Sequence, residues 1–448
     1  MTVRIRVFED IDRARAFLSR PRQLPSTLPA PVRERIRSVF GEELNALQVV
    51  ERIVAAVRAE GDVALRRFTS AFDRIDVANL QVEDEEFAAA RALVPPTVLD
   101  ALRFARERIE RFHRRSIRRS WLEFDEDGAL GQLIRPVDRV GIYVPGGRAP
   151  LPSSLLMTAI PARVAGVSEI IVCTPPGRDG RIAPAIAVAA EMLGIRSVYK
   201  VGGAQAIAAM AFGTESIPKV DIIAGPGNLF VILAKRLVYG EVGIDQLPGP
   251  TETLLIADDS ADAAVCAADL LAQAEHDPLA SAILITTAPR LAQATIRELT
   301  RQLSLLDSAE TARSALEENG AIIVVPNLED AFALANVFAP EHLCLLLRDP
   351  WRYLDRVRHA GGVFLGEASP EVLGDYVAGP SHVMPTGATA RFASPVTVDT
   401  FLKVTSVIAI APEAMERLGL PAMRLATAEG LPAHAAAIER RLERLRPA

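Results

Sequence analysis

The chain has 448 residues, of which 50% are hydrophobic and 24% are charged, and its formal net charge is −6. Its length exceeds one ordinary core of about 100 to 200 residues, so we expect two or more globular domains. The acidic balance argues against a general nucleic-acid-binding protein, which needs an excess of lysine and arginine to neutralise phosphates. The basic run at 111–119 has acidic neighbours and is interpreted as a solvated helix face.

The N-terminal 26 residues mix charged and apolar side chains and contain no apolar core of the kind that a secretory signal needs. No later run approaches about 18 uninterrupted apolar residues, so we predict a cytosolic (cytoplasmic) protein without a membrane span. The cysteines are far apart and show no CxxC spacing, which favours buried thiols over disulfides or a thiolate zinc site. They are Cys173, Cys266 and Cys344.

Helical periodicity runs from about residue 31 to residue 119, for example at Val49, Ile53 and Val57. From residue 139 onward, short apolar runs end in glycine and proline, and alanine-rich helical stretches separate them. This alternation predicts βαβ units and a parallel sheet. We expect one series of strands within 140–147, 170–177, 197–203 and 220–227, and a second at 253–257, 282–286, 321–325, 343–347 and 362–365. Two such series predict two Rossmann-like open α/β halves, followed by a small unit from about residue 392 with a strand at 404–410 and amphipathic helices.

Candidate chemistry begins with the histidines. His113 and His359 lie among arginines in helical stretches, and we expect both to be surface residues. Gln273 and His276 close a predicted helix at 261–275, and their i, i+3 spacing places an amide oxygen and an imidazole on one helix face, as ligands to one metal must be. Taken alone, the spacing is more often that of ordinary surface residues.

Glu341 and His342 stand in a turn before a predicted strand, and turns at the ends of elements tend to carry function. A glutamate beside a histidine offers two bases of different pKa, which suits removal of a proton from an alcohol and activation of water. An exposed turn without a role is the alternative at this point.

Two later segments carry further polar side chains. Asp375 and His382 lie in a glycine- and proline-rich loop at 366–387, and a structureless loop of this length in a compact protein is usually functional. Asp375 would supply a hard oxygen and His382 a hydrogen-bond donor or a base. In the tail, a glycine and a proline interrupt the helical pattern, so Glu429 and His434 are expected at a helix junction.

The sequence lacks the usual dinucleotide-binding motif, because no G-x-G-x-x-G stands between a predicted strand and a helix. Glycine-rich strand ends are the substitute candidates, since glycine lets the backbone approach a pyrophosphate and each segment leads into a helix N-terminus that favours anions. Tight βα turns without a ligand are the alternative for each. The three segments are Tyr143-Val-Pro-Gly-Gly147, Gly202-Gly-Ala-Gln205 and Gly225-Pro-Gly-Asn228.

Together these segments resemble the histidinol dehydrogenase family, and the match runs in order from about Val140 to His434. So many ordered matches make coincidence implausible. The strings are Tyr143-Val-Pro-Gly-Gly, Val201-Gly-Gly-Ala-Gln-Ala-Ile-Ala, Phe212-Gly-Thr-Glu, Gly225-Pro-Gly-Asn, Gln273-Ala-Glu-His, Pro340-Glu-His-Leu and Gly374-Asp-Tyr.

The resemblance implies two Rossmann-like open α/β domains with small N-terminal helical and C-terminal domains, in an intertwined homodimer. We expect residues 1–37 to form the helical segment, and 38–146 with 252–391 to form the first Rossmann-like domain, which carries the metal and base residues. Residues 147–251 would form the second, with the NAD contacts. Residues 392–448 would form the C-terminal domain that reaches the partner subunit.

The resemblance also implies the site. Zn²⁺ would be held by Gln273, His276, Asp375 and His434, a donor set that suits zinc in softness and ligand type. Glu341 would activate water, and His342 would be the acid/base at the substrate hydroxyl. NAD contacts would fall on Tyr143, Gln205 and Asn228, and substrate contacts on Thr251, Gln273, His276, His342, Asp375, His382, Glu429 and His434.

The family's reaction oxidises L-histidinol through L-histidinaldehyde to L-histidine with two NAD and one water, the last two steps of histidine biosynthesis. Two departures from the family pattern, Thr251 in place of serine and Ser381 in place of asparagine, bear on substrate identity rather than reaction type. A paralogous dehydrogenase of another small polar alcohol, such as a sulfonated diol, is therefore the alternative. A non-catalytic, metal-stabilised binding protein is a further one, against which the Glu341-His342 pair argues.

Overall fold

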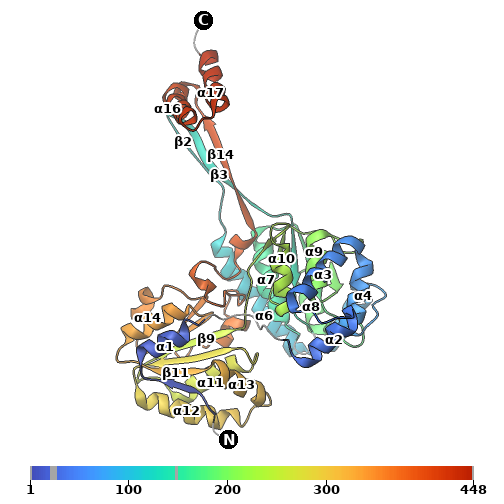
Figure 1. The fold of residues 1–448 in the computed structure, drawn as a ribbon, viewed down its shortest axis with the longest axis vertical. Helices are drawn as coiled ribbons and strands as arrows, with labels where there is room; N and C mark the ends of the chain where they lie inside the picture. The colour runs from blue at the N-terminus through green and yellow to red at the C-terminus, as the bar shows by residue number, and fades with distance from the viewer. Residues whose placement is uncertain (1–2, 21–27, 147–149, 446–448) are drawn as a thin grey trace. The chain divides into compact units, whose positions relative to one another are not determined.

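A computed structural model describes residues 3–20, 28–146 and 150–445 (Figure 1). Its contacts divide the chain into two compact units. The first unit consists of Met1–Ser116 with Val137–Phe401, and the second of Ile117–Pro136 with Leu402–Ala448. Within the described ranges, no helix combines the length and the apolar character needed to span a bilayer.

The first unit contains a six-stranded parallel sheet in the order β1-β11-β10-β9-β12-β13. Neighbouring residues of β9 point to opposite faces, with Leu254 packed among one set of helices and Leu255 among the other. Because helices cover both faces, its central strands are continuous apolar runs rather than alternating ones. The strands are β1 (Arg6–Phe8), β9 (Glu252–Ala257), β10 (Ser281–Thr286), β11 (Ala321–Val324), β12 (His342–Leu346) and β13 (Gly362–Leu365).

Helices α11, α12 and α13 cover one face of this sheet, and α1 and α14 cover the other. Asn327 begins α14, because its side chain accepts a hydrogen bond from the backbone N–H of Asp330. The helices are α1 (Ile11–Leu18), α11 (Ala263–Ala274), α12 (Pro289–Leu303), α13 (Ala309–Asn319), α14 (Leu328–Phe338) and the short α15 (Glu371–Tyr376). Short 3-10 helices follow in the same part of the chain: η2 (Pro350–Arg356), η3 (Thr389–Arg391) and η4 (Val398–Phe401).

A five-stranded parallel sheet, in the order β6-β5-β4-β7-β8, completes the two-sheet core of the first unit. Helices α3, α4, α9 and α10 pack on one face, and α5, α6, α7 and α8 on the other. The strands are β4 (Arg139–Tyr143), β5 (Glu169–Thr174), β6 (Val198–Lys200), β7 (Ile222–Ala224) and β8 (Gly243–Ile244). The helices are α2 (Ala30–Phe40), α3 (Ala46–Glu60), α4 (Asp62–Asp73), α5 (Asp84–Leu93), α6 (Pro96–His113), α7 (Pro152–Ala165), α8 (Pro184–Met192), α9 (Gly203–Phe212) and α10 (Leu229–Val238), and a 3-10 turn, η1 (Arg114–Ser116), follows α6.

The second unit is an antiparallel sheet in the order β14-β3-β2 with two helices packed together. At Gly419 a Cβ atom would lie 2.8 Å from a methyl carbon of Ile438, so glycine allows the two helices to approach closely. Its elements are β2 (Trp121–Asp125), β3 (Gly128–Pro136), β14 (Leu402–Ile410), the 3-10 turn η5 (Pro412–Ala414), α16 (Met415–Ala428) and α17 (Pro432–Leu445).

The predicted α/β class is confirmed, with two parallel sheets at the predicted strand positions and all three cysteines buried and unbridged. The domain boundaries differ from those expected. Residues 1–37 contribute β1 to an edge of the six-stranded sheet, and residues 38–146 supply helices and β4 to the five-stranded sheet instead of joining 252–391. The second unit includes 117–136, and it begins again at Leu402 because Val396 and Phe401 pack in the core of the first unit.

Strand pairing explains these differences. Val140 in β4 pairs with Ile170 of β5 and with Ile222 of β7, both of which lie much later in the chain. The sheet to which a strand belongs is therefore set by the strands with which it forms hydrogen bonds, and these strands can lie far away along the chain.

The surface position expected for His113 is wrong. His113 is 0% exposed, because it follows Ile109 by four residues and so lies on the apolar stripe of α6 that Leu102 and Ala105 begin. Neither ring nitrogen has a hydrogen-bond partner in the described part of the chain, and burial lowers the pKa of His113 to about 4. His359 is half-buried in a segment outside any helix.

We predict that His113 makes the fold sensitive to acid. Its pKa in the folded chain lies below the ordinary value of 6.5, so the unfolded chain binds the proton more readily. Stability is therefore fully present above pH 6.5 and falls as the pH drops from 6.5 toward 4, by up to about 3 kcal/mol. In urea unfolding at pH 7 and pH 4.5, His113→Leu should lose less stability between the two values than the unmodified chain. Equal losses would contradict the prediction.

Candidate active site

The turn between α14 and β12 presents Glu341 and His342. It leaves α14 through Ala339, which has a left-handed backbone conformation (φ 51°), and His342 is the first residue of β12. His342 pairs in register with Thr253 near the start of the neighbouring strand β9. These side chains therefore stand at the amino edge of a parallel sheet, whereas ligands of open α/β sheets usually bind at the carboxyl edge.

Glu341 is a buried carboxyl group held at one oxygen. Its Oε2 accepts hydrogen bonds from the Thr251 hydroxyl at 2.5 Å and from the backbone N–H of Glu252 at 3.0 Å. Burial raises the pKa of Glu341 to about 8, and the two donors oppose that rise only in part. A carboxyl group with this pKa exchanges a proton near neutral pH, as a general base must.

His342 is buried beside it, with 4% of its surface exposed. Its Nδ1 lies 3.1 Å from the backbone carbonyl oxygen of Glu252, which fixes the proton on Nδ1 and makes Nε2 an acceptor. Nε2 has no hydrogen-bond partner among the described residues and lies 3.9 Å from Asp375 Oδ1. Burial lowers the pKa of His342 to about 4, so the ring is neutral at pH 7.

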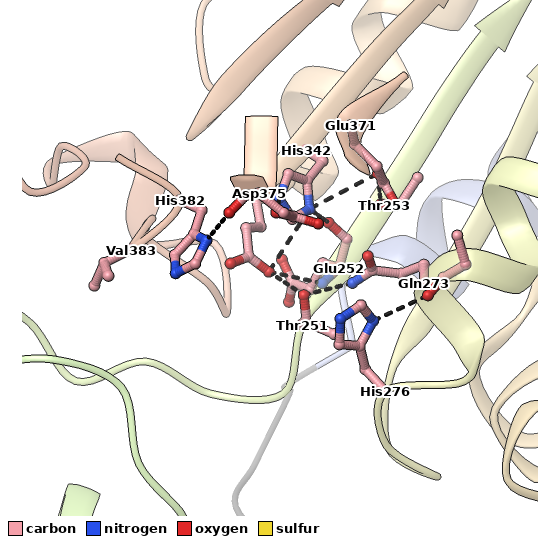
Figure 2. Close-up of polar contacts among 12 residues, drawn as sticks. Thr251, Glu252, Thr253, Gln273, His276, His342, Glu371, Asp375, His382 and Val383 are labelled. Carbon is pink, nitrogen blue, oxygen red and sulfur yellow. Dashed lines mark hydrogen bonds and ion pairs between the residues drawn. The ribbon is translucent and has the colours of Figure 1, made fainter. Parts of the chain in front are cut away.

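Asp375 and His382 lie on the same side of the site as His342 (Figure 2). Asp375 lies on the short helix α15, and its backbone carbonyl accepts from His382 Nδ1 at 2.7 Å. His382 Nε2 lies 3.3 Å from the Ser154 hydroxyl at the start of α7, and burial lowers the pKa of His382. The loop expected at 366–387 is therefore partly helical, which gives Asp375 a fixed position.

Gln273 is 1% exposed on the last turn of α11. With its amide oriented so that both ends are satisfied, its nitrogen donates to Glu371 and Thr253 at 3.1 Å each, and its oxygen faces the Glu252 N–H at 2.8 Å. The residues around the Glu341-His342 pair are thus joined into one polar network.

His276 is exposed just beyond the end of α11. Its Nδ1 lies 2.9 Å from the carbonyl oxygen of Ala272, which leaves Nε2 available. Metal-binding histidines typically bond the second ring nitrogen to a carbonyl or carboxylate in this way. In the described ranges no three His, Cys, Asp or Glu side chains lie close enough to hold a metal ion by themselves. The first unit therefore supplies an amide, an imidazole and a carboxylate as candidate donors.

A cavity of about 1130 Å³ lies at the carboxyl edge of the five-stranded sheet and reaches His276. All three predicted NAD residues line it: Tyr143, Gln205 and Asn228. Gly203 has a φ of +65°, and its N–H donates to the Tyr143 hydroxyl at 3.1 Å. This left-handed conformation favours glycine, and a Cβ there would also force the Gln205 side chain to move, since it would lie 2.8 Å from Oε1. Asn228 is the N-cap of α10, because its side chain accepts from two backbone N–H groups of the first turn.

A sequence model of the histidinol dehydrogenase family matches residues 38–442. The chain belongs to this family. It is 55% identical over 433 residues to histidinol dehydrogenase of Deinococcus radiodurans, which covers 96% of this chain and 98% of the relative. It is 52% identical over 399 residues to that of a Synechococcus strain, with 88% and 92% covered. The crystal structure of histidinol dehydrogenase from Elizabethkingia anophelis matches 99% of both chains at 36% identity, with a TM-score of 0.91.

Within this histidinol dehydrogenase fold, the predicted site residues divide between the units. Thr251, Gln273, His276, Glu341, His342, Asp375 and His382 all lie in the first unit, as do Tyr143, Gln205 and Asn228. Glu429 and His434 lie in the second unit, at the predicted junction between α16 and α17, and both are exposed. Their roles in metal and substrate binding stay predictions.

Sequence reasoning missed three side chains at the histidinol dehydrogenase site. Glu371 is 1% exposed, accepts from the Thr253 hydroxyl and has a pKa raised well above its usual value by burial. Its i, i+4 spacing to Asp375 is a signal that could have found it. Ser154 gave no signal, since its contact with His382 spans 228 residues. Asp73 lines the cavity, and one of its carboxylate oxygens is buried without a partner in the described structure.

Proposed function

We propose that the chain oxidises L-histidinol through L-histidinaldehyde to L-histidine, using two NAD and one water. Membership in the histidinol dehydrogenase family supports this reaction. The observation that carries it is the buried Glu341-His342 pair, in which burial raises the pKa of the acid and lowers that of the histidine. Burial thereby makes the Glu341 carboxylate a stronger base than an exposed glutamate, and it keeps the His342 ring neutral at pH 7, with Nε2 unprotonated.

His342 serves the first oxidation. Its Nδ1–H donates to the Glu252 carbonyl, so the free Nε2 accepts the proton of the substrate hydroxyl. Bound NAD would supply the hydride acceptor for this step. Loss of the hydroxyl proton to His342 and of the hydride from the carbinol carbon converts the alcohol to the aldehyde, a two-electron oxidation.

Glu341 serves the second oxidation. Its carboxylate removes a proton from water as the water oxygen adds to the aldehyde carbon. A second bound NAD would accept the hydride of the hydrate that forms. The Thr251 hydroxyl and the Glu252 N–H hold one oxygen of Glu341, which fixes the carboxylate and leaves its other oxygen to accept the proton. The product is the carboxylate, and four electrons leave the substrate in all.

We place NAD in the cavity at the carboxyl edge of the five-stranded sheet. Its glycine-rich turns lead into α9 and α10, where backbone N–H groups favour the pyrophosphate. Tyr143, Gln205 and Asn228 would contact the cofactor. The cavity also reaches His276, so a candidate metal ligand would lie in the same space as the cofactor.

Zinc is the metal that the donor set favours, with Gln273, His276 and Asp375 from the first unit and His434 from the second. Bound zinc would supply a template that holds the imidazole and amino nitrogens of the substrate. Substrate contacts of Thr251, His382 and Glu429 would then orient the carbinol carbon toward His342.

Turnover with different alcohols tests the proposed substrate. Purified protein should form NADH from L-histidinol and NAD, and a sulfonated diol should give negligible turnover. Negligible turnover of L-histidinol together with rapid turnover of the diol would overturn the proposal in favour of a paralogous dehydrogenase.

We propose further that two chains form a homodimer in which Glu429 and His434 complete the partner's site. Both lie in a unit separate from the one that carries Glu341 and His342, which makes exchange between chains feasible. Mixed dimers of inactive His342→Ala and inactive His434→Ala chains should recover part of the activity, since one of the two sites would then be intact. Failure to recover activity in dimers shown to be mixed would count against shared sites.

A further inference from the structure

An ion pair with no place in the mechanism above lies under the cofactor cavity. Lys235 on α10 and Asp245 just beyond β8 are paired, and their side chains are 0% and 1% exposed. A fully buried ion pair is weak support for stability, because the cost of removing both charges from water can exceed their attraction. Its presence at this position therefore calls for a role other than stability.

Both partners bind the same residue, Gly225. Asp245 Oδ2 accepts from the Gly225 N–H at 2.8 Å, and Lys235 Nζ donates to the Gly225 carbonyl oxygen at 2.8 Å. Gly225 has a φ of +111°, and a Cβ there would lie 2.2 Å from the carbonyl oxygen of Tyr143. The pair thus fixes both peptide groups of a residue that must be glycine and must lie against the end of β4.

Gly225 opens the turn that carries the proposed cofactor contact. The turn at 225–228 connects β7 to α10, and its remaining residues, Pro226, Gly227 and Asn228, line the cavity. Lys235 lies ten residues beyond Gly225 on the following helix, and Asp245 follows the neighbouring strand β8. The ion pair therefore ties the start of the turn to the helix after it and to the adjacent strand.

We propose that Lys235 and Asp245 are positioning residues that hold the 225–228 turn in the shape that binds a dinucleotide. Neither side chain is exposed, so neither touches the cofactor. The inference rests on the proposed use of NAD. It predicts weaker NAD binding when the pair is lost, while the chemical step at Glu341 and His342 is preserved.

A double variant separates positioning from stability. Replacing only one partner leaves a buried charge without its counter-charge, which destabilises any fold. Lys235→Met with Asp245→Leu removes both charges, fills similar volume and releases Gly225. Loss of these charge-assisted hydrogen bonds should raise the Kd and the KM for NAD by about 10-fold or more. The kcat at saturating NAD and the KM for L-histidinol should stay within about two- to three-fold of the values for the unmodified protein.

The Arg139-Glu169 pair provides a control in the same sheet. It joins the first residues of β4 and β5, at the edge opposite the cavity, and in the described structure the Arg139 side chain also contacts Lys219 but no residue of the 202–205 or 225–228 turns. Arg139→Met with Glu169→Leu should leave the Kd for NAD unchanged. If the first double variant does not fold, Lys235→Gln with Asp245→Asn, which removes both charges and keeps polar side chains of similar shape, should still raise the Kd for NAD.

Calorimetric NAD binding and steady-state kinetics on the same preparations decide between the outcomes. An unchanged Kd for NAD in a folded Lys235/Asp245 variant would overturn the inference, as would equal NAD effects in the control pair. Unmodified protein that binds NAD but does not oxidise L-histidinol would refute the proposed function and leave the positioning role standing. Unmodified protein that binds no NAD would refute both.

Discussion

Replacing Glu341 by glutamine is expected to lower the turnover of L-histidinol by about 10²- to 10⁴-fold, the usual contribution of a general base. Glutamine matches the shape of glutamate and can still accept from Thr251 and from the Glu252 N–H, but it cannot remove a proton from water. Circular dichroism and zinc content should match those of the unmodified protein. Steady-state NADH formation measures the effect.

The dependence of turnover on pH also tests whether Glu341 is the base. The pKa of Glu341 is raised to about 8, so the base is protonated below that pH and ionised above it. Activity of the unmodified chain should therefore rise as pH increases through about 8, and this limb should vanish in Glu341→Gln. Glu329→Gln, at an exposed position on α14, is the matched control and should behave as the unmodified chain. Full activity in Glu341→Gln would exclude Glu341 as the base.

Replacing His276 by alanine is expected to give the second large effect, on zinc binding. The contact from Nδ1 to the Ala272 carbonyl leaves Nε2 to face a metal, and removal of the ring deletes one donor. Loss of outer partners of metal ligands alone lowers metal affinity about 10- to 100-fold, so loss of a ligand should cost at least that much. Zinc per chain after dialysis against a weak chelator should fall well below that of the unmodified protein, together with turnover.

His359→Ala is the control for the loss of a histidine, since His359 is half-buried and the described part of the chain shows no polar contact between it and the network around Glu341. It should keep both zinc and activity. Stoichiometric zinc in the His276→Ala protein under the same dialysis would remove His276 from the proposed ligand set.

The strands could be predicted because both sheets are covered on both faces. Residues such as Leu254 and Leu255 are apolar whichever face they meet, so the central strands are continuous apolar runs. Strand pairing could not be predicted in the same way. Val140 pairs with segments 30 and more residues away, and nothing in its local sequence identifies them.

In the candidate site, too, some residues could be predicted from local sequence and others could not. Glu341, His342, Gln273 and His276 could be proposed because each stands at the end of a predictable helix or strand. The contact of Ser154 with His382 could not, because it depends on how α7 packs against a distant turn.

The burial of His113 depends on its four-residue spacing from Ile109. Helix geometry places both residues on one face of α6, whatever charged residues flank the histidine in the sequence.

The proposed two-step oxidation at one pair of bases is tested most directly by counting NADH formed per L-histidinol consumed, with the product identified by chromatography. We predict two NADH and one L-histidine for each L-histidinol, without accumulation of free aldehyde. One NADH per substrate with L-histidinaldehyde as the product, or no NADH at all, would contradict it.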